Sequence, residues 1–415
     1  MRNSSKNRPF TVRFFNTVEP VAPLYRDLIP YWTARGWRVE VVMSRAEYRA
    51  GPETEWLTEG VKIKWTPGFG LKAHKKLAKF LLMVTYNVTA AFKSLFGPTV
   101  DRNLFLTQPP LFFVWGFILK KLRKQPYFIV LMDLYPDVAI QAKLLKAGSF
   151  MAKLLTRISR FGLRKADGVI ALGRCMKQRL LNYGVEEERI RIIPNWTNPG
   201  DILPIPNEDN SFRKEKGWQN KFVVLYSGNI GISHYFDDIL KVSLRLRQNP
   251  EILFVFIGYG LRLREIKQYK ETHGLQNIEL LPFQDRDKLS MSLSAGDVHF
   301  VSLRMGFEGL VVPSKTYGIF AAGRPVIYQG DPRGEIATLI EEEDVGRVVP
   351  LDNPGQLEAA ILNYRLDPLL AYNQGIKARR LAQERYGSQA ALEKYSQALK
   401  TAFGNPAGGQ TFEKV

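Results

Sequence analysis

The feature that most constrains the fold of this 415-residue chain is an alternation of short apolar runs with helix-length segments, which occurs twice. Such alternation is typical of parallel sheets covered by helices. The runs predicted as strands are 11–15, 38–43, 61–65, 103–107, 127–132, 168–172 and 189–193, and then 222–226, 252–257, 278–281, 298–303, 325–328 and 346–349. We therefore expect an α/β protein with two Rossmann-like, doubly wound parallel sheets.

A stretch with four prolines and no helical period, 194–210, separates the two halves and is typical of a linker between domains. An apolar content of 45% is enough for packed cores and excludes general disorder. Because ligands bind at the carboxyl ends of parallel strands, we expect the two sheets to face an interdomain cleft. The predicted boundaries are 1–198, 199–385, and a C-terminal helix and tail, 386–415, that packs back toward the N-terminal domain.

The net positive charge lies entirely in the first half of the chain. Residues 1–200 contain 33 lysines and arginines against 14 acidic residues, whereas residues 201–415 contain 26 of each sign, so the first half carries the whole +19. A basic field of this kind attracts a nucleic acid, an anionic membrane surface or a phosphate-bearing substrate.

The cysteine content and the apolar runs indicate the cellular compartment. Cys175 is the single cysteine, and the N-terminal residues do not form a secretory signal, so we expect a reducing, cytoplasmic environment. The longest uncharged apolar runs, 80–92 and 111–119, are shorter than the roughly 20 residues that cross a bilayer.

Four loops of the second half follow predicted strands at the end where a nucleotide would bind. The first contains Gly228 and Gly231, which let the backbone approach a phosphate beside a helix expected near Tyr235. A plain turn between strand and helix explains this loop equally well. The next two loops contribute Gly258 and Gly260, and then Pro282 and Phe283.

The fourth loop, 308–327, contains the start of a helix. Pro313 suits the first helical turn, and Ser314 and Lys315 lie beside its free N–H groups. A lysine at a helix N-terminus is a suitable site for a diphosphate.

In this order and spacing, the motifs resemble the retaining, nucleotide-sugar-dependent glycosyltransferases of the GT-B fold, family 4. The similarity is greatest to the bacterial subgroup that builds cell-surface polysaccharides, including colanic-acid and N-acetylfucosamine transferases. The segments that carry the resemblance are 107–140, 165–181, 192–198, 226–234, 256–266, 312–327 and 330–340. It implies an acceptor-binding N-terminal domain, a nucleotide-sugar-binding C-terminal domain, and no required cofactor.

Family members hold the donor diphosphate with an arginine and a lysine in the first of these loops. Gly228 matches the motif, but Asn229 and His234 occupy the two cation positions. The resemblance therefore leaves Lys315 and Arg304 as candidates for the leaving-group charge, with His234 donating a hydrogen bond or becoming cationic.

The family also carries two glutamates eight positions apart, which contact the donor sugar and the ribose. Glu308, followed by Gly309 and Leu310, resembles the first, whereas the second position falls on Gly318. Glu335 matches a glutamate found near this point in many members and is a candidate substitute for the ribose contact. Favourable charge at a helix N-terminus is the alternative explanation of Glu335.

The acceptor side offers two candidates. The family often places His-Asp at the end of a central strand, and here the pair reads Met132-Asp133. Asp133 is expected to orient the acceptor hydroxyl or assist its deprotonation, or alternatively to cap the next helix. Glu19, after the first strand, is a candidate by position only.

The sequence does not indicate a metal site. Asp285 and Asp287 have the spacing with which two carboxylates bind a divalent cation, but they open a helix-like segment, and N-terminal capping explains them. The four histidines lie far apart and form no ligand pattern.

Segment 71–96 has an apolar centre flanked by five lysines, which are Lys72, Lys75, Lys76, Lys79 and Lys93. It predicts a helix that packs partly on the sheet and lies partly in the headgroup region of an anionic membrane. No nucleic-acid-binding module is evident, so we expect no nucleic-acid partner.

The sequence thus predicts a cytoplasmic glycosyltransferase, peripherally associated with the inner face of the plasma membrane. It would transfer a hexose or N-acetylhexosamine-type sugar, with retention, from a UDP-sugar to a lipid-linked (polyprenyl diphosphate) or saccharide acceptor. The expected catalytic residues are Asp133, Glu308 and Lys315. The alternatives are a nucleotide-sugar epimerase of the same fold and a non-catalytic basic protein that binds membranes or nucleic acid.

Overall fold

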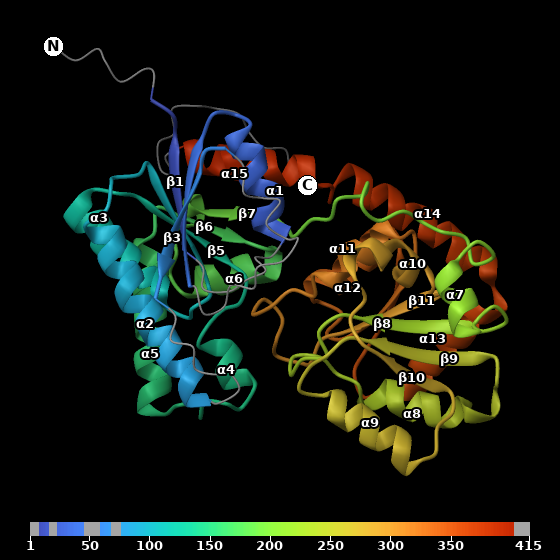
Figure 1. The fold of residues 1–415 in the computed structure, drawn as a ribbon. Helices are drawn as coiled ribbons and strands as arrows, with labels where there is room; N and C mark the ends of the chain where they lie inside the picture. The colour runs from blue at the N-terminus through green and yellow to red at the C-terminus, as the bar shows by residue number, and fades with distance from the viewer. Residues whose placement is uncertain (1–7, 16–22, 45–58, 68–75, 402–415) are drawn as a thin grey trace. The chain divides into compact units, whose positions relative to one another are not determined.

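A computed structural model of the protein describes residues 8–15, 23–44, 59–67 and 76–401 (Figure 1). The chain divides into two compact units, each built around a parallel sheet of its own. The N-terminal unit comprises Met1–Ile193 and Leu392–Val415, and the C-terminal unit comprises Pro194–Ala391.

The N-terminal unit contains a seven-stranded parallel sheet in the order β3-β2-β1-β4-β5-β6-β7. The seven strands predicted in the first half are therefore confirmed to within about a residue at each end. They are β1 (Thr11–Phe15), β2 (Arg38–Ser44), β3 (Val61–Thr66), β4 (Arg102–Leu106), β5 (Tyr127–Leu131), β6 (Gly168–Ala171) and β7 (Ile190–Ile192).

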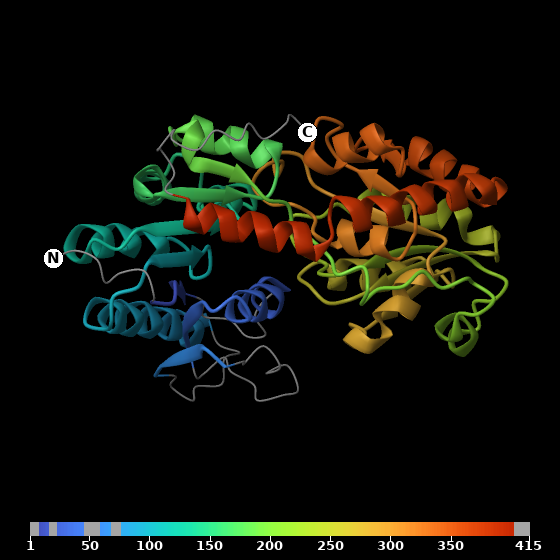
Figure 2. The same ribbon diagram turned by 90° about the horizontal axis from the view of Figure 1, so that it is seen from above.

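Helices cover this sheet, and the last helix of the chain belongs largely to the same unit. The Trp32 indole donates to Ser396 Oγ at 2.8 Å, and the Arg102 guanidinium donates to the Leu399 carbonyl at 2.8 Å. Figure 2 shows this last helix in red beside the N-terminal elements. The helices are α1 (Pro23–Thr33), α2 (Lys76–Leu95), α3 (Trp115–Arg123), α4 (Asp137–Gln141), α5 (Phe150–Lys165), α6 (Arg174–Asn182) and α15 (Ser388–Lys400), with short turns η2 (Phe112–Val114) and η3 (Glu187–Arg189).

The C-terminal unit contains a six-stranded parallel sheet in the order β10-β9-β8-β11-β12-β13. Its strands are β8 (Phe222–Ser227), β9 (Ile252–Ile257), β10 (Ile278–Leu281), β11 (Val298–Ser302), β12 (Val326–Gln329) and β13 (Gly346–Val349). Its helices are α7 (Ser211–Lys216), α8 (Asp237–Arg245), α9 (Leu263–Thr272), α10 (Leu289–Ser294), α11 (Lys315–Ala321), α12 (Glu335–Glu343), α13 (Pro354–Leu366) and α14 (Pro368–Glu384), with short turns η4 (Leu246–Gln248) and η5 (Arg286–Lys288).

The central strands are buried on both faces. Every residue of β5 and of β9 is buried, which is the pattern of parallel strands covered by helices on both sides. The core of the C-terminal unit gathers apolar side chains of β8, β9 and β11 beneath α8 and α13. The loops at the strand ends are thereby attached to a rigid scaffold.

The sequence made two predictions about membranes: that no segment spans a bilayer, and that a lysine-flanked helix lies partly in the headgroup region. Within the described ranges, no helix is both long enough and apolar enough to span a bilayer. The predicted lysine-flanked helix is α2, but Lys72 and Lys75 lie outside the described residues, as does Glu19.

Candidate functional site

The strand order of the C-terminal sheet reverses between β8 and β11. In open α/β sheets, ligands bind at this reversal, beyond the carboxyl ends of the strands. The loops that leave β8 and β11 are 228–236 and 303–314, and they contain most of the predicted donor-binding residues. The topology therefore brings together residues that lie about 80 positions apart in the sequence.

Three glycines allow the loops after β8 and β9 to pack backbone against backbone. A Cβ atom on Gly258 would lie 2.0 Å from the carbonyl oxygen of Gly228, and one on Gly260 would lie 2.1 Å from that of Ile230. The φ angles are positive at all three, with 139° at Gly228, 141° at Gly258 and 159° at Gly260. A Cβ on Gly228 would meet Lys315 Cε at 3.3 Å, so this glycine also makes room for the lysine.

Lys315 is the first residue of α11, and its ammonium group contacts β8. Its Nζ donates to the Tyr226 hydroxyl, lies 3.7 Å from the centroid of that ring, and lies 3.4 Å from His234 Nε2. Burial lowers the pKa of Lys315 well below its usual value, and no described carboxylate forms an ion pair with it. The residue is half-buried, and a shielded cation without an ion-pair partner is typical of a site that binds an anion.

His234 is buried beside Lys315 and is neutral. Its Nδ1 donates to the Ser302 carbonyl at 2.6 Å, which leaves Nε2 as the acceptor facing the lysine. Burial, followed by the nearby Lys315 charge, lowers the pKa of His234 to about 3. The expectation that His234 becomes cationic is therefore wrong, and its ring N–H is already committed to a carbonyl.

The helix expected near Tyr235 is α8. It begins at Asp237, and both Asp237 and Asp238 lie in its first turn. Asp238 is fully buried and accepts hydrogen bonds from Gln329 Nε2 and the Asn353 N–H. These carboxylates complement the positive end of the helix, and its predicted role beside a phosphate stays a prediction.

The loop after β11 adds a second cation and a carboxylate. The Arg304 backbone N–H donates to the Ser233 carbonyl at 2.8 Å, which joins the two loops, and its guanidinium forms no ion pair with a described residue. Glu308 Oε2 accepts from the Gly306 N–H at 2.7 Å. Gly309 has a φ of 71°, and Leu310 is buried.

Two further predicted positions lie at helix starts. Glu335 begins α12, and a Cβ on Gly334 just before it would lie 3.7 Å from Glu308 Cγ, so this helix start lies beside Glu308. Ser314 is exposed at the N-cap of α11 and makes no capping hydrogen bond. Gly318 lies within α11, and a Cβ added there would lie 3.7 Å from the Leu293 side chain and 3.8 Å from that of Ile202.

Exposed aromatic rings follow β9 and β10. Tyr259 and Phe283 are 56% and 52% exposed, and their ring centroids lie 5.7 Å apart in an edge-to-face arrangement. Pro282 and Phe283 were predicted in this position, whereas Tyr259 was missed. The Gly-Tyr-Gly sequence after a strand was the available signal.

Comparison with known proteins identifies the chain. The model of the glycosyl transferase 4-like domain matches residues 21–196, and the model of glycosyl transferases group 1 matches residues 208–382. Together they span most of both units. The chain belongs to glycosyltransferase family 4.

Curated relatives of this glycosyltransferase come from bacteria. WbjE of Pseudomonas aeruginosa, named as a glycosyltransferase, is 27% identical over 300 residues, which are 72% of each chain. WcaI of Escherichia coli strain K12, named as a colanic acid biosynthesis glycosyl transferase, is 28% identical over 250 residues, which are 60% of each chain.

Solved structures share the fold. HepE from Anabaena, in complex with UDP and glucose, has a TM-score of 0.72 at 16% identity and covers 94% of this chain and 99% of its own. WaaG, a glycosyltransferase involved in lipopolysaccharide biosynthesis, has a TM-score of 0.67 at 17% identity and covers 96% of this chain and all of its own. The predicted GT-B architecture of two Rossmann-like domains is confirmed.

In the N-terminal unit of the glycosyltransferase, Asp133 lies two residues beyond β5. Its backbone N–H donates to Thr107 Oγ1 at 3.3 Å, and burial raises the pKa of its carboxyl to about 6. Helix α4 begins at Asp137 with Pro136 as its N-cap, so the alternative that Asp133 caps this helix is wrong. A carboxylate with such a pKa is suited to accept a proton near neutral pH.

Asp285 and Asp287 flank the start of the turn η5. Asp285 is its N-cap by position but makes no capping hydrogen bond, so capping by this side chain is not observed. Arg286 between them pairs with Asp201 at 2.6 Å. Within the described ranges, no three His, Cys, Asp or Glu side chains are grouped as in a metal site.

Proposed function

We propose that this glycosyltransferase moves a hexose or N-acetylhexosamine-type sugar from a UDP-sugar to a lipid-linked (polyprenyl diphosphate) or saccharide acceptor, with retention. The observation that carries this proposal is the half-buried Lys315 ammonium at the reversal point of the C-terminal sheet, with no ion pair to a described carboxylate. HepE was solved with UDP, with UDP and glucose, and with UDP-glucose, which supports a UDP-sugar donor. The name of WcaI supports a role in cell-surface polysaccharide synthesis.

Lys315 would stabilise the charge that develops on the departing diphosphate. In the transfer, the bond between the anomeric carbon and the diphosphate oxygen breaks while a bond to the acceptor oxygen forms. Tyr226 and His234 hold the lysine ammonium in place, so little rearrangement is needed when charge develops. Arg304 is the second candidate cation, and Gly228, with neighbouring Asn229 and Gly231, gives the diphosphate access to the backbone.

Glu308 and Glu335 would contact the sugar and the ribose. Glu308 lies in the loop after β11 with one carboxylate oxygen held by the Gly306 N–H, and the start of α12 lies beside it. Carboxylates held in this way accept hydrogen bonds from hydroxyl groups. Glu335 is therefore our candidate for the ribose contact in place of a glutamate at Gly318.

The exposed rings of Tyr259 and Phe283 would pack against the nucleotide base. Tyr259 follows β9, which neighbours β8, and Phe283 follows β10, the next strand along the sheet, so both lie at the same edge as Lys315. Aromatic faces stack on bases at a gain of about 1–3 kcal/mol per base.

Asp133 would act on the acceptor. Its carboxyl is buried at the carboxyl end of β5, and its pKa of about 6 makes it ionised but still basic at neutral pH. The basic N-terminal unit would bind the phosphate-bearing acceptor and contact the inner face of the plasma membrane as a peripheral, cytoplasmic protein.

A screen of nucleotide sugars tests this function. The protein is incubated with UDP-, GDP- and dTDP-linked sugars, with and without a bacterial lipid extract, and both released nucleotide and sugar products are measured. We expect UDP release that depends on the extract. An isomerised nucleotide sugar formed without acceptor would instead identify an epimerase. If the protein neither turns over nor saturably binds any of the donors, a non-catalytic binding protein would be favoured.

A further inference from the structure

The outward face of α5 in the N-terminal unit is divided lengthwise into a basic and an apolar stripe. The 16-residue helix FMAKLLTRISRFGLRK contains five cationic residues and no acidic residue. Because its spacing places positions three and four apart on one side, Lys153, Arg157, Arg160 and Arg164 form one continuous stripe.

The apolar stripe lies directly beside the basic one. Phe150 is 79% exposed, and Leu154 and Phe161 are about 40% exposed. The opposite side of the helix, with Ala152 and Leu163, is buried against the unit. Phe161 packs edge-to-face against Phe117 of α3, with ring centroids 4.8 Å apart. The stripe nevertheless keeps a large part of its apolar surface exposed.

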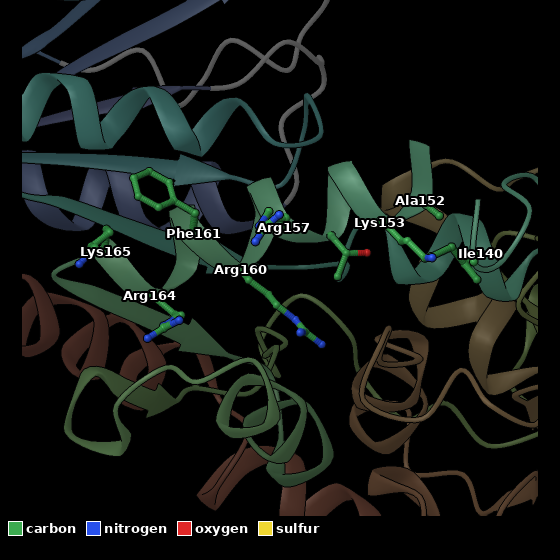
Figure 3. A pocket seen from close by; sticks show the side chains of 10 residues that line it. Ile140, Ala152, Lys153, Arg157, Arg160, Phe161, Arg164 and Lys165 are labelled. Atoms are coloured by element: carbon green, nitrogen blue, oxygen red, sulfur yellow. The ribbon is translucent and has the colours of Figure 1, made fainter. Parts of the chain in front are cut away.

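The basic stripe is open to an external anion. Neither Lys153 nor Arg157 makes an ion pair with a described residue, and both are exposed, whereas Arg160 lies over the Tyr183 ring at 4.8 Å. A cavity of about 700 Å³ runs along this stripe (Figure 3). In that view Phe161 extends to a different side of the helix from Arg160 and Arg164.

We propose that this α5 face, defined by the two stripes, docks on a bilayer that contains anionic phospholipid. The basic stripe binds headgroup phosphates, and the apolar stripe enters the boundary between headgroups and acyl chains. This inference rests on the membrane contact proposed above and assigns it to α5, not to the lysines before and at the start of α2. A nucleic acid would use the cations but leaves the exposed aliphatic and phenyl groups without a partner.

The neighbouring helices extend this surface. α3 packs against both α2 and α5, so the three form one layer. Leu122 of α3 is 66% exposed, and α2 exposes Val88 and Phe92 at 51% and 60%. Exposed apolar side chains therefore occur on all three helices of this layer.

Vesicle sedimentation tests the proposal with the full-length protein. Vesicles of phosphatidylcholine alone are compared with vesicles containing phosphatidylglycerol, at low and high salt. The variant Lys153→Gln/Arg157→Gln removes two exposed charges of the basic stripe, and Lys214→Gln/Arg264→Gln removes two exposed charges from helices of the C-terminal unit. We expect the α5 variant to lose roughly tenfold or more in partitioning to the anionic vesicles at low salt, and the matched control to bind as wild type.

A second variant, Phe150→Gln/Leu154→Gln, addresses the apolar stripe and should weaken binding at both salt concentrations. The proposal is overturned if wild-type protein stays in the supernatant, if it binds neutral vesicles equally well, or if the α5 variant binds like its control. Retention on an RNA oligonucleotide without vesicle binding would also overturn it. UDP affinity, measured on the same preparations, reports separately on the proposed donor site.

Discussion

The Lys315 ammonium forms no ion pair with a described carboxylate. Its neighbouring side chains explain how it is kept in place. The Tyr226 hydroxyl accepts from its ammonium and itself donates to the Asn229 carbonyl at 2.6 Å. His234 presents a neutral, accepting nitrogen because its other nitrogen is bonded to Ser302. The Tyr226 and His234 side chains thus hold the ammonium in place without forming an ion pair with it.

The pKa of Lys315 predicts how UDP binding depends on pH. Burial lowers this pKa in the free protein, and a bound diphosphate would raise it again, so binding should take up protons and weaken as the pH rises past the pKa of the free lysine. Calorimetric titration with UDP from about pH 7 to 9, where the phosphate is fully ionised, measures this effect. Replacement of Lys315 by methionine should remove the pH dependence, and a wild-type affinity that stays constant would count against this account.

The raised pKa of Asp133 predicts that the ionised carboxylate, which activity requires, lowers the stability of the folded protein. Its folded-state pKa of about 6 lies above its ordinary value, so its contribution to stability is present at low pH and lost as the pH rises from about 4 to 6. Asp133→Asn should therefore raise the free energy of unfolding at pH 8 by on the order of 1–2 kcal/mol and have little effect near pH 4. Urea denaturation at the two pH values checks this.

The same variant should lose sugar transfer, and wild-type activity should fall as the pH drops through about 6, because only the ionised carboxylate accepts a proton. Full activity of a well-folded Asp133→Asn protein would remove this residue from the acceptor site.

At the residue scale, the sequence identified Lys315 and Asp133 but not their surroundings. The Lys315 and Tyr226 side chains meet across 89 positions of chain, and no local pattern predicts that contact. The tautomer of His234 is fixed by a carbonyl 68 positions away. Burial and hydrogen-bond partners, which decide the charge, come only from the assembled fold.

Among the elements, the loops after β8 and β9 depend on direct backbone contact. Gly258→Ala would place a Cβ 2.0 Å from the Gly228 carbonyl oxygen, so both loops must shift. We expect a loss of on the order of 2–4 kcal/mol in unfolding free energy, from overpacking together with an unfavourable positive φ, and weaker UDP binding.

Gly217→Ala is the matched control, because Gly217 also has a positive φ of 72° but a Cβ added there would meet nothing within 4 Å. It should cost only about 1–2 kcal/mol and leave UDP affinity unchanged. Equal losses in the two variants would show that contact between the loops is unimportant.

Element positions were predictable where apolar runs are long and bounded by turns, as in β9. The helix expected near Tyr235 begins at Asp237, within the usual uncertainty of a helix end. The position of Arg13 could not be predicted from the sequence. It lies fully buried in β1 and pairs with Glu40. A charge inside a strand is usually expected to face solvent, and only its partner explains its burial.

For the whole molecule, the alternating pattern predicted two parallel sheets, but not the strand order within them. That order places the reversal between β8 and β11 and so decides which loops meet. The charge asymmetry was readable from the sequence, yet the separation of basic and apolar stripes on α5 required helix boundaries and side-chain exposure.

The central claim is that the C-terminal unit binds a nucleoside diphosphate through Lys315. The most direct measurement is the dissociation constant of UDP for wild-type protein, Lys315→Ala and the exposed-lysine control Lys214→Ala, by calorimetry at neutral pH. A hydrogen bond to a charged group contributes about 1.5–3 kcal/mol, so Lys315→Ala should bind UDP roughly ten- to a hundredfold more weakly, while Lys214→Ala binds like wild type. Wild-type affinity in a folded Lys315→Ala protein would contradict the account.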